Sequence, residues 1–152
     1  MKVFISYGDI ADQITALRLQ ALAAVNGLTV YVPPANTRQA LLLAPESAQK
    51  LKDAEVILGV IGNRLTEACR LELNTAIASG RATIVMCYPP VAQQLQQFFG
   101  RNLVVIDPAN PDLAEQKIVQ YLKAVNAQKN TMIAVLALAT LALGLLIFAP
   151  AD

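Results

Sequence analysis

The chain has 152 residues, of which 55% are hydrophobic and 15% are charged, and its formal net charge is +1. This length suits a single domain, and the basic residues are too few and too scattered to indicate a nucleic-acid partner. The sequence contains no histidine, which excludes a histidine-based catalytic triad and a histidine-ligated metal, and its two cysteines are too few for a structural zinc site.

Strand-like and helix-like patterns alternate along residues 1–128. Short apolar runs, typical of strands buried on both faces of a parallel sheet, occupy residues 3–7, 28–32, 55–62, 82–88 and 103–106. Helical patterns occupy residues 10–26, 45–54, 66–80, 91–99 and 112–128. This alternation predicts an α/β fold: a five-stranded parallel doubly wound sheet with right-handed crossovers and the flavodoxin-like strand order 2-1-3-4-5.

Two segments in the first quarter of the chain contain residues that favour turns and loops, namely residues 8–9 and 33–38. Gly8 and Asp9 turn the chain after the first strand, and Asp9 is a candidate N-cap for the helix at 10–26. The periodicity of that helix is carried by four apolar residues, Ile14, Leu17, Leu22 and Val25. A pair of prolines then excludes a helix or a central strand, so residues 33–38 must form a loop.

The stretch 66–80 holds the candidate catalytic residue. At about 100° per residue, one arc of this helix would face the core and contains Cys69, Leu73, Ala76 and Ile77. Glu72 lies at the margin of that arc, where a carboxylate is half-desolvated, so that its protonation can be tuned and it can meet a ligand. The alternative is a helical glutamate that reaches water past its apolar neighbours.

The predicted topology places Glu72 near a crevice. In the order 2-1-3-4-5, a ligand crevice opens where the first and third strands part, at their carboxyl ends. Residues 6–9 follow one of these ends, and residues 62–64 follow the other, directly before the helix that carries Glu72. Arg38 and Arg64 are candidate partners of a phosphate group, or else solvated loop charges.

Residues 131–149 form a run of 19 residues without a charge. As a helix the run would be about 28 Å long, which matches the hydrocarbon core of a bilayer. Lys117, Lys123 and Lys129 precede it, whereas no basic residue follows it. The positive-inside rule therefore predicts a single-pass helix in the inner (cell) membrane, with residues 1–130 in the cytoplasm.

Three parts of the chain together resemble the Toll/interleukin-1 receptor (TIR) domain family. The run VFISY at residues 3–7 resembles the first strand of that family, and CRLEL at residues 69–73 resembles its Trp-Cys-x-x-Glu-Leu helix. The proline-rich loop at residues 33–41 takes the place of the family's BB loop. The resemblance covers residues 1–128 as a TIR-like domain and leaves residues 129–152 as a transmembrane tail anchor.

The resemblance implies a membrane-tethered NAD+ glycohydrolase, with NAD+ as substrate and no metal. Many bacterial members of the family cleave NAD+ at its nicotinamide glycosidic bond with the glutamate that Glu72 matches. The residues implied in binding the dinucleotide are Ser6, Tyr7, Gly8, Asp9, Asn36, Arg38 and Cys69. The family also implies activation by self-association through the loop at 33–41, which would present Asn36 and Arg38 at its tip. Bacterial members with a membrane segment are commonly anti-phage effectors.

A single carboxylate suits this reaction. Departure of nicotinamide leaves an oxocarbenium-like ribose, which a carboxylate can stabilise or attack. Nicotinamide leaves as a neutral group from a pyridinium, so no second carboxylate is needed to protonate it. The chain departs from the family pattern at Ala68, where a tryptophan is usual, and at Gly62, where a serine often ends the third strand.

Two alternatives remain open. Residues 51–57 and 82–85 resemble nucleoside 2-deoxyribosyltransferases, which place a nucleophilic glutamate on the equivalent helix, but the aspartate and the Gly-Thr usual in that family are missing. The other alternative is a non-catalytic TIR scaffold that oligomerises at the membrane. A Glu72 that lines an open pocket favours an enzyme, whereas a Glu72 occupied in an ion pair, for instance with Arg70, favours the scaffold.

Overall fold

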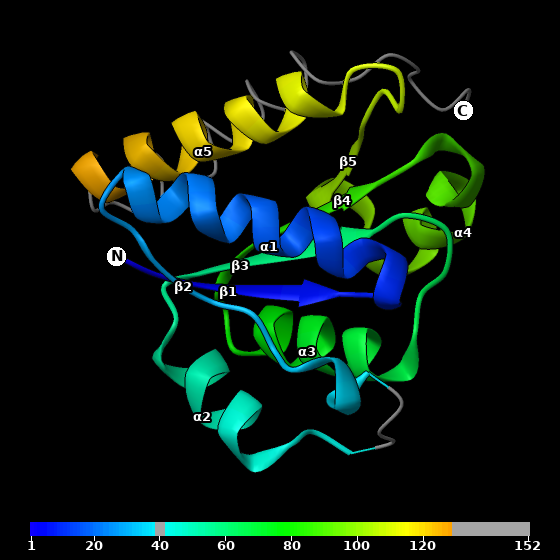
Figure 1. The fold of residues 1–152 in the computed structure, drawn as a ribbon. Coiled ribbons are helices and arrows are strands. Elements are labelled where there is room, and N and C mark those ends of the chain that lie inside the picture. The colour runs from blue at the N-terminus through cyan, green and yellow to red at the C-terminus, as the bar shows by residue number, and fades with distance from the viewer. Residues whose placement is uncertain (39–41, 129–152) are drawn as a thin grey trace.

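The computed structural model describes residues 1–38 and 42–128, in which strands alternate with helices (Figure 1). The strands are β1 (Lys2–Tyr7), β2 (Thr29–Tyr31), β3 (Val56–Ile61), β4 (Ala82–Cys87) and β5 (Leu103–Val105). The α-helices are α1 (Ile10–Val25), α2 (Pro45–Asp53), α3 (Glu67–Ala78), α4 (Pro89–Phe99) and α5 (Pro111–Gln128). Short 3-10 turns lie at Ala35–Thr37 and Gly100–Asn102.

The sheet is parallel throughout, in the order β2-β1-β3-β4-β5. The predicted α/β fold and strand order are therefore confirmed. Helices α1 and α5 cover one face of the sheet, and α2, α3 and α4 cover the other (Figure 1). Each face thus has its own apolar core, and the central strand β3 is buried at every residue, as a strand between two helical layers must be.

The pairing of β1 with β3 brings α3 close to the sheet. Ser6 near the end of β1 lies opposite Gly59 of β3. A Cβ at Gly59 would lie only 3.0 Å from Cδ1 of Leu73 on α3, so any larger residue would require the Leu73 side chain to move by a few tenths of an ångström. Cys69, Leu73 and Ala76 are completely buried, as the helical arc predicts.

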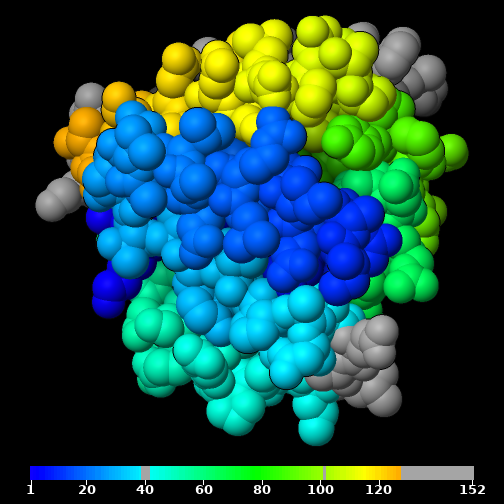
Figure 2. Space-filling model, in the orientation of Figure 1, coloured from blue at the N-terminus to red at the C-terminus, as the bar shows by residue number. Residues whose placement is uncertain are grey.

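Helix α1 turns its predicted apolar residues outward. Its exposed large apolar residues are Ile10, Ile14, Leu17, Leu22 and Val25. The side that contacts the sheet carries Ala16, Leu19 and Ala23 instead. Small side chains allow the helix backbone to lie close to the sheet, so the larger apolar residues remain on the opposite side. Helix α1 lies across the face of the molecule shown in Figure 2.

The predicted membrane span at residues 131–149 lies outside the described residues. Within residues 1–38 and 42–128, no helix has both the length and the apolar character needed to cross a bilayer. The tail anchor and the topology that depends on it therefore remain predictions.

The packing of α3 predicts a difference between two substitutions on the same helix. Leu73→Ala should lower the free energy of unfolding by about 2–4 kcal/mol, because Leu73 is completely buried and its loss leaves a cavity. Ile77, which was predicted to share the buried arc, is 37% exposed, so Ile77→Ala should lower it by about 1 kcal/mol or less. Urea unfolding of the full chain in mild detergent, followed by tyrosine fluorescence, measures both. Equal losses would contradict the packing described for α3.

Candidate functional site

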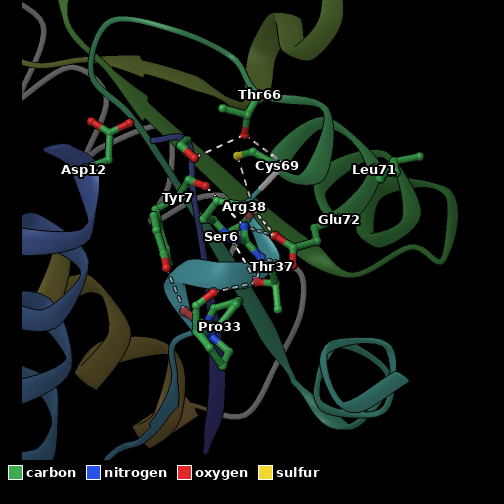
Figure 3. A network of polar contacts seen from close by, with 12 residues as sticks. Ser6, Tyr7, Asp12, Pro33, Thr37, Arg38, Thr66, Cys69, Leu71 and Glu72 are labelled. Atoms are coloured by element: carbon green, nitrogen blue, oxygen red, sulfur yellow. Dashed lines mark hydrogen bonds and ion pairs between the residues drawn. The ribbon is translucent and has the colours of Figure 1, made fainter. Parts of the chain in front are cut away.

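The carboxyl end of β1 brings four predicted site residues together (Figure 3). Ser6 lies on β1, Cys69 and Glu72 lie on α3, and Arg38 enters from the loop after β2. Glu72 is only 1% exposed, so its predicted half-desolvated place at the margin of the helix is wrong. The loop after β2 covers α3 at this point, and periodicity within the helix cannot reveal such a cover.

Glu72 and Arg38 form a buried, two-pronged ion pair. Nη1 of Arg38 donates to Oε1 of Glu72 at 2.7 Å, and Nη2 donates to Oε2 at 2.8 Å. The Ser6 hydroxyl donates to the same Oε1 at 2.7 Å. Burial opposes the charge of Arg38, but the hydrogen bonds and charge of Glu72 leave the pKa of the guanidinium above its usual value. Arg70, the partner considered from the sequence, pairs instead with Glu67.

Arg38 also holds the loop against β1. Its Nη1 donates to the carbonyl oxygen of Tyr7 at 3.2 Å, and its guanidinium carbon lies 4.8 Å from the centre of the Tyr7 ring. The Tyr7 hydroxyl donates to the carbonyl oxygen of Pro33 at 2.8 Å, and Thr37 Oγ1 accepts from Nη2 of Arg38 at 2.9 Å. The predicted display of Arg38 at the loop tip is therefore wrong, because Arg38 is 4% exposed. Asn36 is exposed, as predicted.

Cys69 lies beside the ion pair as an inert thiol. Its Sγ is 3.2 Å from the Ser6 hydroxyl oxygen, and the side chain is completely buried. Burial raises the pKa of the Cys69 thiol to about 12, so the thiol stays protonated at neutral pH. Cys69 therefore contributes packing at this site and does not act as a nucleophile.

A second carboxylate, that of Asp12, joins the two loops that border the crevice. Its Oδ1 accepts from the backbone N of Gly62 at 2.9 Å, and its Oδ2 accepts from the backbone N of Asp9 at 3.3 Å. A Cβ at Gly62 would lie 2.5 Å from Oδ1, and a Cβ at Gly8 would lie 2.7 Å from Oδ2. Asp12 thus explains why glycine, and not serine, follows β3.

The sequence-based site omitted Asp12, although one local signal pointed to it. Asp9 is the N-cap of α1, as predicted, and Asp12 three residues later completes a capping box. That spacing identifies the bond to the helix start. It does not identify the bond to Gly62, which is 50 residues away along the chain.

An open cavity of about 260 Å³ lies beside the ion pair. It is lined by Asp9, Ile10, Ala11, Ala35, Arg38, Arg64 and Thr66. Arg38 therefore lies between this cavity and Glu72, which is not part of its lining. The first turn of α1 and the N-cap of α3 border the cavity, and helix N-termini favour anions.

The buried Asp12 predicts a pH dependence of stability. Burial raises the pKa of its carboxyl to about 6, whereas an unfolded aspartate titrates near 4. The folded protein therefore binds more protons than the unfolded chain in this window, and the free energy of unfolding falls as the pH rises from about 4 to about 6. Allowing for solvent screening, we expect a loss on the order of 1–2 kcal/mol.

Urea unfolding of wild-type and Asp12→Asn protein at several pH values between 4 and 7 checks this prediction. The difference in free energy of unfolding between the two proteins should change across the window, because only the wild type carries this carboxyl. Glu115, whose pKa burial also raises, is common to both proteins and cancels in the difference. Parallel pH profiles would contradict the assignment to Asp12.

The site thus consists of the buried Glu72 carboxylate, which is paired with the planar guanidinium of Arg38, and of a neighbouring cavity bordered by two helix N-termini. Such a carboxylate can stabilise positive charge on a ligand, provided that Arg38 gives way to it. Among residues 1–38 and 42–128, no group of three or more histidine, cysteine, aspartate and glutamate residues is placed to hold a metal ion. Comparison of the chain with protein-family models, with curated proteins and with solved structures gives no match.

Proposed function

We propose that the chain is a membrane-tethered TIR-domain NAD+ glycohydrolase, activated by self-association in anti-phage defence or signalling. In this proposal Glu72 stabilises the ribosyl cation that forms when nicotinamide leaves NAD+. The form in which Arg38 pairs with Glu72 is then a resting state. The observation that carries the proposal is the buried contact between Glu72 and a guanidinium at the ligand crevice of the sheet.

Arg38 has the charge and shape that the reacting ribose would present to Glu72. Its guanidinium is a planar, delocalised cation 2.7 Å from the carboxylate. An oxocarbenium ion is likewise planar at the reacting carbon and shares its charge with oxygen. If Arg38 withdrew, Glu72 would keep only the hydrogen bond from Ser6, and an unpaired buried carboxylate is unfavourable by several kcal/mol. A pyridinium nucleotide would restore the missing positive charge.

The cavity beside the ion pair would receive the rest of the dinucleotide. Arg64 and the first turn of α1 form part of its wall. Backbone N–H groups at a helix start and a guanidinium both favour phosphate oxygens. Gly8 precedes that first turn, and the proposal gives it close backbone approach to a phosphate. The Asp9 carboxylate already caps the start of α1 and would repel a phosphate, so its proposed part in binding is limited to the uncharged parts of the dinucleotide.

Activation in this proposal is a movement of residues 33–38 in the loop after β2. These residues are held by the bond from Tyr7 to Pro33 and by the ion pair of Arg38 with Glu72. Breaking a buried ion pair is unfavourable by about 3–5 kcal/mol, so new contacts between copies, or the substrate itself, must offset it. A membrane tail would favour such contacts because it raises the effective concentration of the chains.

Glu72 is occupied in an ion pair and does not line the cavity, which is the arrangement expected from the sequence for a second candidate function, a non-catalytic TIR scaffold. Three hydrogen bonds from Ser6 and Arg38 satisfy Glu72 within the protein. In a scaffold the pair would only fix the shape of the loop for self-association. The two functions differ in whether Arg38 ever leaves Glu72.

Nicotinamide release from NAD+ by the full chain, under conditions that promote assembly, separates the two. Glu72→Gln alone leaves the buried Arg38 unpaired and should lower the free energy of unfolding by about 3–5 kcal/mol. The double variant Glu72→Gln/Arg38→Met removes both charges, so we expect it to retain most of the wild-type stability. It should nevertheless release nicotinamide on the order of 10³-fold more slowly than the wild type.

The matched control is Glu67→Gln/Arg70→Met, which removes an exposed ion pair from the same helix. Exposed pairs contribute little, so its activity should match the wild type and its stability should change by no more than about 0.5 kcal/mol. A wild-type chain that assembles without releasing nicotinamide would contradict the enzyme and favour the scaffold. Transfer of deoxyribose between nucleosides without NAD+ cleavage would favour a deoxyribosyltransferase.

Asn36 allows a separate test of assembly through the loop. The side chain is exposed, whereas Arg38→Glu would place two carboxylates together in a buried site and unfold the region. Asn36→Arg should weaken self-association and slow nicotinamide release together, and should leave the free energy of unfolding within about 0.5 kcal/mol of wild type. Analytical ultracentrifugation measures the association. Wild-type assembly by this variant would rule out a contact through Asn36.

A further inference from the structure

The outer face of α1 is apolar, whereas the outer faces of α2 and α4, on the other side of the sheet, are mainly polar. Among the exposed residues of α1, only Arg18 has a polar side chain. By contrast, α4 exposes four glutamines, and α2 exposes mainly charged residues. The usual pattern of a surface helix, with its apolar side inward and its polar side outward, is therefore absent from α1.

The apolar residues of α1 form one continuous strip. Ile10, Ile14, Leu17, Ala21 and Val25 recur at helical spacing and are all exposed, so they lie along one side for the full length of about 24 Å. Arg18, at the edge of this side, is drawn toward α5. Its guanidinium pairs with Asp112 at 2.5 Å and with Glu115 at 3.1 Å. We call these five apolar residues the outer strip; α1 runs across the face shown in Figure 2.

The place where α5 ends indicates what covers the outer strip. Helices α1 and α5 pack beside each other and end on the same side of the molecule (Figure 1). The described part of α5 ends at Gln128, and the uncharged run begins at residue 131. Three residues span at most about 11 Å, so the run starts within that distance of the end of α5.

We propose that the outer strip of α1 lies on the surface of the lipid bilayer that residues 131–149 cross. The inference rests on the membrane tether of the proposed function, but not on its catalytic part. Apolar helix faces bury themselves about 5–10 Å into the boundary between headgroups and acyl chains. With α1 on the bilayer, every copy would hold residues 33–38 at the same distance from the membrane, so that assembly is restricted to a plane.

The bilayer explains the outer strip better than two other occupants. If residues 131–149 packed on the outer strip, only one side of this uncharged run would be buried. A bilayer would bury the run on all sides, and it would leave the outer strip to the membrane surface. A second copy would meet a strip of roughly 24 Å by 10 Å, or about 240 Å² per chain, far below the roughly 800 Å² per partner of a stable interface.

A single introduced tryptophan tests the proposal, because the chain has none of its own. The full-length Ile14→Trp protein is reconstituted in nanodiscs that hold one copy and contain brominated phosphatidylcholine. The matched control is Phe98→Trp, which replaces a half-exposed aromatic residue on α4, on the opposite face of the sheet. We expect lipid bromine to quench the fluorescence at position 14 by about twofold or more and to leave position 98 nearly unquenched, because only the outer strip would enter the boundary between headgroups and acyl chains.

Each other result overturns the proposal in a distinguishable way. Failure of the wild-type chain to float with phospholipid vesicles would exclude both the tether and the inference. Flotation with equal, weak quenching at positions 14 and 98 would exclude only the inference. If the tryptophan at position 14 became shielded from water only in discs with two copies, and lipid bromine did not quench it, the outer strip would be assigned to a second copy. Nicotinamide release, measured separately, decides the catalytic proposal whatever the quenching shows.

Discussion

The buried ion pair between Arg38 and Glu72 is the interaction on which the site depends. Two charges removed from water are stable only if hydrogen bonds replace the lost hydration. Here Arg38 donates to both carboxylate oxygens, to the Tyr7 carbonyl and to Thr37, and Ser6 donates to Glu72. The pair therefore joins β1, the loop after β2 and α3. Removal of one partner should lower the free energy of unfolding more than removal of both, because it leaves a buried charge unpaired.

The loops that border the crevice are held in place by two separate sets of hydrogen bonds. Asp12 holds the loops after β1 and β3 together through backbone N–H groups, and glycines at positions 8 and 62 make room for its carboxylate. The loop after β2 is held differently, by hydrogen bonds from the side chains of Arg38 and Tyr7 to backbone carbonyl oxygens. A carboxylate covered in this way is available to a ligand only when the loop moves. Exposure of Glu72 is thus coupled to anything that binds the loop.

The fold also has two unlike sides. On the face covered by α3, the apolar residues of that helix pack on the sheet, and the ion pair of Glu72 with Arg38 lies at the carboxyl end of β1. On the opposite face of the sheet, α1 places small residues inward and larger apolar residues outward. The two surfaces meet at the start of α1, because Ile10 belongs to the outer strip and also lies in the lining of the cavity beside the ion pair. The rest of the outer strip, from Ile14 to Val25, does not line that cavity.

The sequence by itself determined the α/β class, the strand order and the gathering of Ser6, Cys69 and Glu72 at one end of the sheet. Strands buried on both faces must be apolar runs, and the crossover rules leave few topologies. Only the tertiary structure decided that Arg38 pairs with Glu72, because 34 residues separate them and neither has a local signal for the other. It also decided which side of α1 faces the sheet. Periodicity identifies a face of a helix, but the contact surface is chosen by which side chains allow the closest packing.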